Sequence, residues 1–418
     1  MLIKADALER LVAAIFAGEG CSEAEAAAIG RHLVSSNLAG HDSHGVIRVP
    51  RYVVGLREGR VVKGQTMAVV TQMGAMAVVD GGYGFGQWIG EQAVAFGIAK
   101  AKESGTAIVA LRNSGHLGRI GGWAEIAAEA GLVSVHFVNV AGSLLVAPFG
   151  GVDRRMSTAP FAVGVPRPGE APMILDFATS LVAEGKVLVA SNGGKPLPAG
   201  ALIEPDGHLS TDPQTLYGPI TGLGQRNPAR GSGSIRAMGE YKGSGLAFMC
   251  EILAGALTGG GCAGPGERSR IANGMLSIYM SPAAFGSDAA FAEETRRYVG
   301  FFKSSRPDRP GGEVLTPGEP ELHYRTKRLK EGVPLEAETW EALRAAAGNA
   351  GLEENWVAGL VALVSPIGRG YFDASFPSFF AGSPEISVTS FCTMASAKEL
   401  KSSICSTKEP GPPATFSR

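Results

Sequence analysis

Strand-like and helix-like segments follow one another along this chain without a clean β-α-β repeat. Apolar and β-branched patterns predict strands at residues 67–80 (a pair around a glycine), 106–111, 132–140, 159–165 and 173–177. Repeated β-α-β units would give a parallel sheet, so their absence favours a mixed one. The sequence therefore predicts an α/β fold of mixed α+β type, built around a mixed sheet.

Helical periodicity marks much of the chain between these strands. Near the N-terminus, Ser22 and Glu25 form a capping-box pattern at the start of the second of two helices. This helix is expected to end near Leu38, directly before a junction that contains histidine and glycine. The expected helices cover residues 5–17, 23–38, 47–56, 86–102, 123–130, 242–257 and 336–347.

Charge and cysteine content argue against several classes of protein. The chain has 418 residues with 38 basic and 39 acidic side chains, so no nucleic-acid or membrane partner is expected. Its five cysteines are scattered without a C-x-x-C pair, which argues against a disulfide framework and a structural zinc site. No segment has the profile of a signal peptide or the roughly 18 apolar residues of a membrane span. We therefore expect a cytoplasmic protein.

The stretch from His41 to Arg48 brings two imidazoles, a hydroxyl, a carboxylate and a guanidinium close together in sequence. Such groups can hold a small carboxylate and move a proton. We expect His44 to act on the substrate and Arg48 to fork onto its carboxylate. His41 is expected to be structural or to support the residues that touch the substrate. His44, Arg48 and Tyr52 follow a spacing of four, which places them on one helical face. His41 and His44 also have a metal-site spacing, but no third ligand cluster accompanies them, so no metal is expected.

A second cluster runs from Arg112 to Arg119 and follows a predicted strand. His116 stands just beyond the carboxyl end of that strand, where α/β enzymes often place functional side chains. Its neighbouring arginines and the first cluster favour a functional role over that of a surface histidine. The remaining histidines have no such company and are interpreted as structural: His32, His136, His208 and His323.

The sequence lacks the glycine patterns that bind nucleotides in the commonest folds. Its strict G-x-G-x-x-G, at residues 259–264, follows a predicted helix rather than a strand and precedes Pro265. It is therefore interpreted as a loop, and no Walker A pattern is present either. A dinucleotide, if one binds, must be held in another way.

Several longer motifs are specific enough to indicate a protein family. They lie at residues 37–45, 118–125, 146–150, 175–180, 242–243, 249–257 and 317–319. Together they resemble the malate/L-lactate dehydrogenase type 2 family, whose members are NAD(P)-dependent oxidoreductases unrelated to the Rossmann dehydrogenases. The resemblance runs from the first helix to about Leu352.

The resemblance implies a large mixed, mostly antiparallel sheet domain with a helical domain, in a non-Rossmann dinucleotide-binding fold and usually a homodimer. Residues 1–66 would form the N-terminal helical segment that carries His44 and Arg48. Residues 67–310 would form the cofactor- and substrate-binding sheet domain, and residues 311–352 would return to the helical domain. Residues 353–418 look like an atypical, partly disordered tail.

The resemblance also implies roles for individual residues. His116 would accept the substrate proton, His44 would lie by the nicotinamide and the substrate, and Arg48 would anchor the carboxylate. Ser43 and Thr158 would also contact the substrate. The cofactor, NAD or NADP, would contact His44 together with Gly118, Arg119, Ile120, Asp176, Phe177, Ala178, Lys242, Asn273, Gly318 and Glu319.

Two departures from the family pattern concern this site. Tyr241 replaces the histidine that usually precedes the motif lysine, and Ala159 replaces an asparagine. Alanine offers none of the amide hydrogen bonds that this asparagine would make near the substrate or cofactor.

The sequence therefore predicts an oxidoreductase that interconverts a small 2-hydroxy acid and its 2-oxo acid with a nicotinamide cofactor. A second hypothesis keeps the fold and takes a cyclic ketimine, pyrroline- or piperideine-2-carboxylate, as the substrate to be reduced. A third, motivated by the lost asparagine and by an unusual sequence at residues 224–238 before Lys242, is a family member that binds ligands without catalysis. A substrate panel with both cofactors distinguishes the three.

Overall fold

The computed structural model describes residues 1–191, 196–220, 226–264, 270 and 272–362. Its first part is a cluster of helices formed by elements from the N-terminal and the C-terminal parts of the described residues. The N-terminal elements are β1 (Leu2–Ile3), α1 (Ala5–Gly18), α2 (Glu23–Leu38) and α3 (Val49–Arg57). They meet α10 (Glu319–Glu331), β12 (Val333–Pro334), α11 (Ala337–Asn349) and α12 (Glu354–Ala362). The N-cap bond of the expected capping box is present, since Ser22 Oγ accepts a hydrogen bond from Glu25 N.

Helix α12 extends this cluster beyond residue 352. Val357 and Leu360 are buried in the same apolar core as Leu8, Leu11 and Ile15 of α1. The helical cluster therefore continues at least into the start of the segment expected to be a tail. Residues 363–418, which make up most of that segment, lie outside the described residues.

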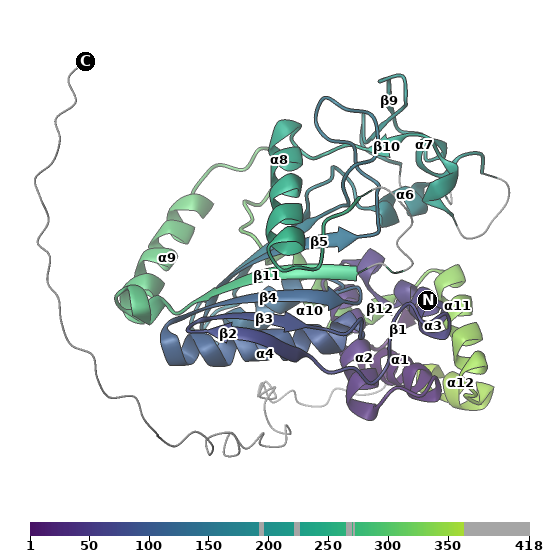
Figure 1. Ribbon diagram of the computed structural model, residues 1–418, viewed down its shortest axis with the longest axis horizontal. Coiled ribbons are helices and arrows are strands. Elements are labelled where there is room, and N and C mark those ends of the chain that lie inside the picture. The colour runs from purple at the N-terminus through teal and green to yellow at the C-terminus, as the bar shows by residue number, and fades with distance from the viewer. Residues whose placement is uncertain (192–195, 221–225, 265–269, 271, 363–418) are drawn as a thin grey trace, which may run out of the picture. The chain divides into compact units, whose positions relative to one another are not determined.

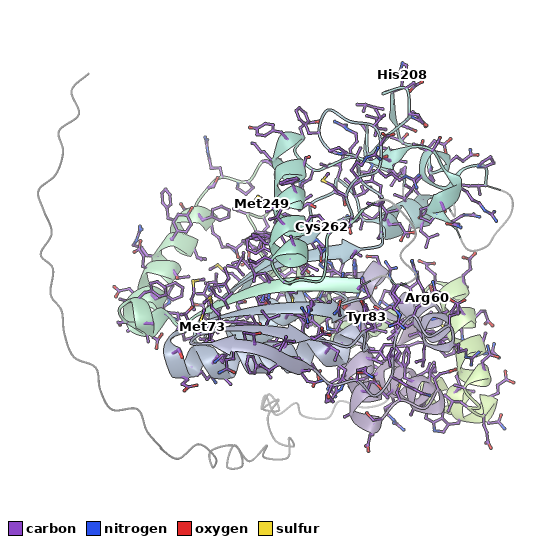
Figure 2. The ribbon with its side chains drawn as sticks, viewed as in Figure 1. Arg60, Met73, Tyr83, His208, Met249 and Cys262 are labelled. Atoms are coloured by element: carbon purple, nitrogen blue, oxygen red, sulfur yellow. The ribbon has the colours of Figure 1, made fainter. Side chains whose placement is uncertain are left out.

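The second part is a mixed sheet. Within the described residues it has seven strands in the order β2-β3-β4-β11-β5-β6-β7. Only β3 and β4 pair in parallel, and the other neighbours are antiparallel, which confirms the predicted mixed, mostly antiparallel sheet. The strands are β2 (Ala68–Met73), β3 (Met76–Asp80), β4 (Thr106–Ser114), β5 (Val133–Ala141), β6 (Pro160–Val165), β7 (Met173–Ala178) and β11 (Ala272–Met280). Met73, labelled in Figure 2, is exposed at the end of the edge strand β2.

Strand β11 joins the two halves of the sheet, although it comes last in sequence. Leu276 stands opposite Ala110 of β4 on one side and Phe137 of β5 on the other. The sequence pattern predicts no strand here. The tertiary fold places this late segment in the centre of the sheet, and the aligned strands are shown in Figure 1.

Helices cover the two faces of this sheet (Figure 1). On one face α4 (Gly86–Ser104) and α5 (Gly121–Glu129) bury Trp123 and Tyr279 in a common core. On the other face lie α8 (Tyr241–Cys250) and its continuation, a π-helix over Glu251–Ala256. Successive residues of β5 point to opposite faces of the sheet. Val138 packs in the core formed with α4 and α5, while the next residue, Asn139, donates a hydrogen bond to Glu251 of the π-helix.

A smaller unit precedes α8. It contains β8 (Leu202–Ile203), β9 (Leu209–Ser210) and β10 (Ser234–Ile235), with the short helices α6 (Glu184–Ser191) and α7 (Gln214–Tyr217). Helix α9 (Asp288–Lys303) follows the central strand. In the part of the chain that the structure describes, no helix combines the length and the apolar character needed to cross a membrane.

Candidate active site

The turn that carries His44 is held by side-chain contacts from the end of α2. Asn37 accepts a hydrogen bond from Val46 N at 2.9 Å and donates one to Asp42 Oδ1 at 2.6 Å. Gly45 is required here, because a Cβ atom at this position would lie 2.2 Å from Asn37 Oδ1. The motif glycine therefore lets the chain pass directly over the asparagine, which sets the position of His44.

Helix α10, distant in sequence, braces the same turn. Arg328 donates two hydrogen bonds to the carboxylate of Asp42, at 2.6 and 2.9 Å. His41 Nε2 lies 3.2 Å from Glu321 Oε1. These contacts give Asp42 and His41 structural partners, in agreement with the structural role expected for His41.

The side chains of His44 and Arg48 lie beside Ser43. Ser43 Oγ is 3.0 Å from His44 Nδ1, and Arg48 Nε donates to the Ser43 carbonyl oxygen at 2.6 Å. Among the described residues, no acceptor engages the other N–H groups of the Arg48 guanidinium. Its fork therefore remains available to a carboxylate, the group that it suits best.

His116 faces this turn from the segment after β4. Its ring stacks on that of His44 with a centroid distance of 5.7 Å and an interplanar angle of 18°. Tyr52 of α3 lies within hydrogen-bond distance, with its hydroxyl oxygen 2.6 Å from His116 Nδ1. The next residue is fixed by Asn273 of β11, whose Oδ1 accepts from Leu117 N at 2.7 Å. The two histidine clusters predicted from the sequence therefore form one site.

Burial keeps both imidazoles neutral. It lowers the pKa of His116 to about 3, with further lowering from the nearby guanidinium groups of Arg48 and Arg51. Burial, Arg48 and the neighbouring histidines also lower the pKa of His44 well below its ordinary value. Burial raises the pKa of Tyr52 to about 12. At neutral pH the site therefore presents uncharged proton carriers beside fixed positive charges.

Arg119 and Asp176 form a second group of polar side chains at the start of α5. Arg119 is buried and donates to Glu125 Oε2 at 2.7 Å, while its Nε and Nη1 have no hydrogen-bond partner among the described residues. Asp176 accepts from Gly121 N at 2.9 Å, and burial raises the pKa of its carboxyl group. Unused donors on a buried guanidinium suit the phosphate and ribose oxygens of a dinucleotide, so these residues fit the implied cofactor.

Two glycines show how closely the backbone packs around this group. Gly118 has a φ of 73°, and a Cβ atom there would lie 2.4 Å from His32 Nε2. His32 itself accepts a hydrogen bond from Arg119 N at 3.1 Å and stacks on Trp123, so its structural role agrees with expectation. Gly318 has a φ of 92°, and a Cβ atom there would lie 2.9 Å from the nitrogen of Ile174 in β7.

The other residues assigned to the cofactor have varied surroundings. Next to Gly318, Glu319 accepts from Lys303 Nζ at 2.5 Å and from Thr316 N at 2.7 Å. Ile120 is buried in the core under the sheet, and the Phe177 ring lies 5.7 Å from that of Phe161. Ala178 ends β7, opposite Pro160.

Three other residues expected at the site, Asn273, Thr158 and Lys242, have the following surroundings. Asn273 is buried and both ends of its amide are already bonded, to Leu117 N and to the carbonyl oxygen of Asn139. The carbonyl of Thr158 accepts from Thr179. Lys242 is exposed in the first turn of α8, and no hydrogen bond or ion pair joins its side chain to another described residue.

The two departures from the family motif have distinct structural settings. Ala159 is fully buried with a φ of 30°, a conformation that asparagine tolerates better than alanine. Tyr241 is largely exposed, and its ring lies 6.2 Å from that of Phe149.

Three side chains that shape the site were not assigned to it from the sequence: Asn37, Tyr52 and Gln87. Tyr52 had a signal, since it follows His44 and Arg48 at a spacing of four. Gln87 donates from Nε2 both to Tyr52 and to the His116 carbonyl oxygen, at 3.2 and 3.0 Å. Such contacts, which connect separate segments, leave no periodic trace in the sequence.

The chain is similar to several known dehydrogenases and to a related reductase. Hydroxycarboxylate dehydrogenase B of Escherichia coli K12 is 41% identical over 354 residues, which cover 84% of this chain and 94% of that protein. The Delta(1)-pyrroline-2-carboxylate/Delta(1)-piperideine-2-carboxylate reductase of Pseudomonas putida is 32% identical over 345 residues, covering 81% of this chain and 94% of the reductase. The solved structure of malate dehydrogenase from Pyrococcus horikoshii superposes with a TM-score of 0.74 at 28% identity, covering 84% of this chain and 96% of the other. The model of the malate/L-lactate dehydrogenase family matches residues 3–344, so the expected resemblance is confirmed and the chain belongs to that family.

Proposed function

We propose that this protein interconverts a small 2-hydroxy acid and its 2-oxo acid with a nicotinamide cofactor. The observation that carries the proposal is the pairing of the Arg48 guanidinium, with its free donors, and the stacked rings of His44 and His116. An anion-binding fork beside a neutral imidazole is the arrangement needed to hold a 2-oxo carboxylate and to exchange a proton at its C2 oxygen. The family relationship supports the same reaction.

Each residue has a defined part in this reaction. Arg48 holds the carboxylate, and Ser43 and His44 contact the substrate next to it. His116 takes the hydroxyl proton when a 2-hydroxy acid is oxidised and returns it on reduction. The nicotinamide, when bound, accepts or supplies the hydride at C2. The group around Arg119 and Asp176 would hold the dinucleotide, together with the backbone at Gly118 and Gly318. Ile120, Phe177, Ala178, Lys242 and Glu319 are proposed contacts of the same cofactor.

The choice between NAD and NADP, the assembly and the location are parts of the same proposal. The acidic residue that selects NAD in Rossmann folds has no counterpart rule in this fold, so both cofactors are to be tested. We propose a homodimer, as implied by the family resemblance, and a location in the cytoplasm, as expected from the scattered cysteines. Light scattering coupled to size exclusion gives the mass in solution, and a mass of one chain contradicts the dimer.

A substrate panel tests the function directly. Purified protein is mixed with NADH or NADPH and with 2-oxo acids of increasing size, and the loss of nicotinamide absorbance is followed. The proposal predicts turnover of at least one 2-oxo acid, and formation of reduced cofactor when the matching 2-hydroxy acid is supplied with the oxidised form. Binding of cofactor without turnover of any compound would instead support the third hypothesis, a ligand-binding protein.

Reduction of a cyclic ketimine is the second candidate function. It is favoured by the 32% identity to the pyrroline- and piperideine-2-carboxylate reductase of Pseudomonas putida. These cyclic imines also carry a carboxylate that Arg48 could hold, and they also need a proton carrier. Including them in the same panel decides between the two, because the better substrate class has the higher kcat/KM.

A further inference from the structure

His116 belongs to a closed hydrogen-bond network with Tyr52 and Gln87, which come from two different helices. The Tyr52 hydroxyl oxygen lies 2.6 Å from His116 Nδ1 and 3.2 Å from Gln87 Nε2. Gln87 Nε2 also lies 3.0 Å from the carbonyl oxygen of His116. Gln87 is fully buried and Tyr52 is nearly so. The proposed function gives His116 a proton to exchange but does not assign a role to this network.

The direction of each hydrogen bond in the network follows from one carbonyl group. The backbone oxygen of His116 can only accept, so the nearby atom of Gln87 is the amide nitrogen, and it donates. The same amide nitrogen donates to the Tyr52 oxygen. The Tyr52 hydroxyl must then place its own proton elsewhere, and among the described residues His116 Nδ1 is its one remaining acceptor. Nδ1 therefore accepts, and a neutral His116 ring carries its proton on Nε2.

We propose that Tyr52 holds His116 in this tautomer and passes its phenolic proton to Nδ1 while Nε2 gives its proton to the C2 oxygen of the 2-oxo acid. This inference rests on the proposed function of His116. The N–H bond at Nε2 breaks as the new O–H bond of the hydroxy acid forms. The O–H bond of Tyr52 breaks as the N–H bond at Nδ1 forms. The Nδ1 proton then returns to the Tyr52 phenolate while Nε2 takes a proton from water and leaves hydroxide, which restores the starting tautomer.

The electrostatics of the site agree with a relay that leaves the imidazole uncharged. Burial and the guanidinium groups of Arg48 and Arg51 disfavour an imidazolium at His116, so its pKa falls to about 3 and a charged donor is scarce at neutral pH. His32 and His44 also face this region and do not offset that effect. Gln87, Arg48 and Arg51 all favour a negative charge on Tyr52, although burial outweighs them in the free protein. A phenolate is a much weaker base than an alkoxide, so the overall proton transfer runs toward the hydroxy acid.

Tyr52→Phe removes the phenolic proton and retains the ring, which lies 6.3 Å from that of Phe85. In the reducing direction we expect kcat to fall by at least about tenfold, as for loss of a positioned acid, while KM for the 2-oxo acid changes little. Tyr279→Phe is the matched control, since Tyr279 is also buried and packs in the core under the sheet. A Tyr52→Phe enzyme with the kcat of wild type overturns the relay.

Nitrogen NMR of histidine-labelled protein without cofactor or substrate tests the tautomer separately. We expect the His116 signals, identified by their loss in His116→Gln, to show a protonated Nε2 and an unprotonated Nδ1. Tyr52→Phe should shift the Nδ1 signal and leave the thermal unfolding midpoint close to that of wild type. A protonated Nδ1 in the wild-type protein overturns the proposal.

The His116 variant also distinguishes failure of the relay from failure of the proposed function. Loss of turnover in His116→Gln with unchanged turnover in Tyr52→Phe rejects the relay alone. Unchanged turnover in His116→Gln rejects the role of His116 and the relay together.

Discussion

Arg48 illustrates how one side chain serves both the structure and the proposed chemistry. Its Nε is used to hold the Ser43 carbonyl oxygen, while its terminal nitrogens remain available to an anion. A planar fork can therefore be braced on one side and bind a carboxylate on the other. Lysine has the same charge, but its three donors share one nitrogen atom, so it does not reproduce a fork that is braced on one side and binds a carboxylate on the other.

Arg48→Lys should therefore weaken substrate binding more than it slows the chemical step. We expect KM for the 2-oxo acid to rise by about tenfold or more, which corresponds to loss of roughly 1.4 kcal/mol of binding, with a smaller change in kcat. Steady-state kinetics measures both. Arg112→Lys is the matched control, because Arg112 is already paired with Asp80 at 2.8 Å. Equal effects of the two substitutions would contradict the anchoring role of Arg48.

At the residue scale, the sequence predicted the clusters but not the bonds between them. His44, Arg48 and His116 stand in motifs, and the structure brings the two histidine rings into contact. Asn273 was assigned to the cofactor by resemblance, and the structure adds that its side chain links β11 to Leu117 and β5. Contacts of this kind depend on which strands become neighbours, and that information is not local.

At the scale of elements, a buried ion-pair group joins α5 to α10. Glu125 accepts from Arg119 at 2.7 Å and from Arg325 at 2.9 and 3.0 Å. The two guanidinium groups hold the pKa of Glu125 below its ordinary value despite its burial. The group therefore connects the sheet domain to the helix that also braces Asp42.

Glu125→Gln should destabilise the fold, because it removes the carboxylate that is hydrogen-bonded directly to the buried Arg119 guanidinium. Breaking a buried pair in this way typically costs about 3–5 kcal/mol in the free energy of unfolding. Urea denaturation followed by circular dichroism measures the change. Glu294→Gln removes an exposed pair with Arg297 and should cost little. If the two variants were equally stable, the Glu125 group would not hold the domains as described.

Some helices and strands were predicted correctly from the sequence, and others were not. Apolar spacing was sufficient for α1, α2, α4 and β4, whose bounds lie close to those expected. It did not predict β11, and it treated α8 and the π-helix as one regular helix. Gly274 of β11 shows how closely these two elements approach, because a Cβ atom at this position would lie 1.9 Å from the Ala254 carbonyl oxygen of the π-helix. The strand and the π-helix pack directly against each other, and the sequence pattern of either segment alone does not predict this contact.

At the scale of the whole molecule, buried histidines link stability to pH. Burial lowers the pKa of His32 and of His136 to about 3, from a value of 6.5 in an exposed setting. Between about pH 3 and pH 6.5 these histidines are protonated in the unfolded chain but not in the folded chain. The free energy of unfolding should therefore fall as the pH falls from about 6.5 toward 3, by up to about 1.4 kcal/mol per pH unit for each such histidine.

His136→Gln isolates one of these contributions away from the proposed site. His136 lies between the hydroxyl groups of Ser134 and Ser277, at 3.0 and 2.9 Å. We expect the variant's free energy of unfolding, from urea titrations at pH 7 and pH 5, to change less with pH than that of wild type. Buried carboxyl groups with raised pKa values, such as Asp176, act in the opposite direction but are common to both proteins. His208→Gln is the control, because His208 is exposed (Figure 2). An unchanged pH dependence in His136→Gln would contradict this account.

The overall architecture was predicted mainly through the family resemblance. Periodicity alone predicted a mixed sheet, and the motifs added its mostly antiparallel character and its helical partner. The division near residues 66, 310 and 352 stays a prediction, and α12 already extends the helical cluster beyond the last of these. Strand order and the path of α10 back to the His44 turn depend on long-range packing.

The most direct test of the central claim is the turnover of His116→Ala with the best 2-oxo acid of the panel. Turnover is followed by nicotinamide absorbance, and cofactor binding is measured separately by calorimetry. The account predicts that kcat falls at least about tenfold, as expected for loss of a general acid, while the cofactor still binds. A variant that binds the cofactor and retains the turnover of wild type would contradict it.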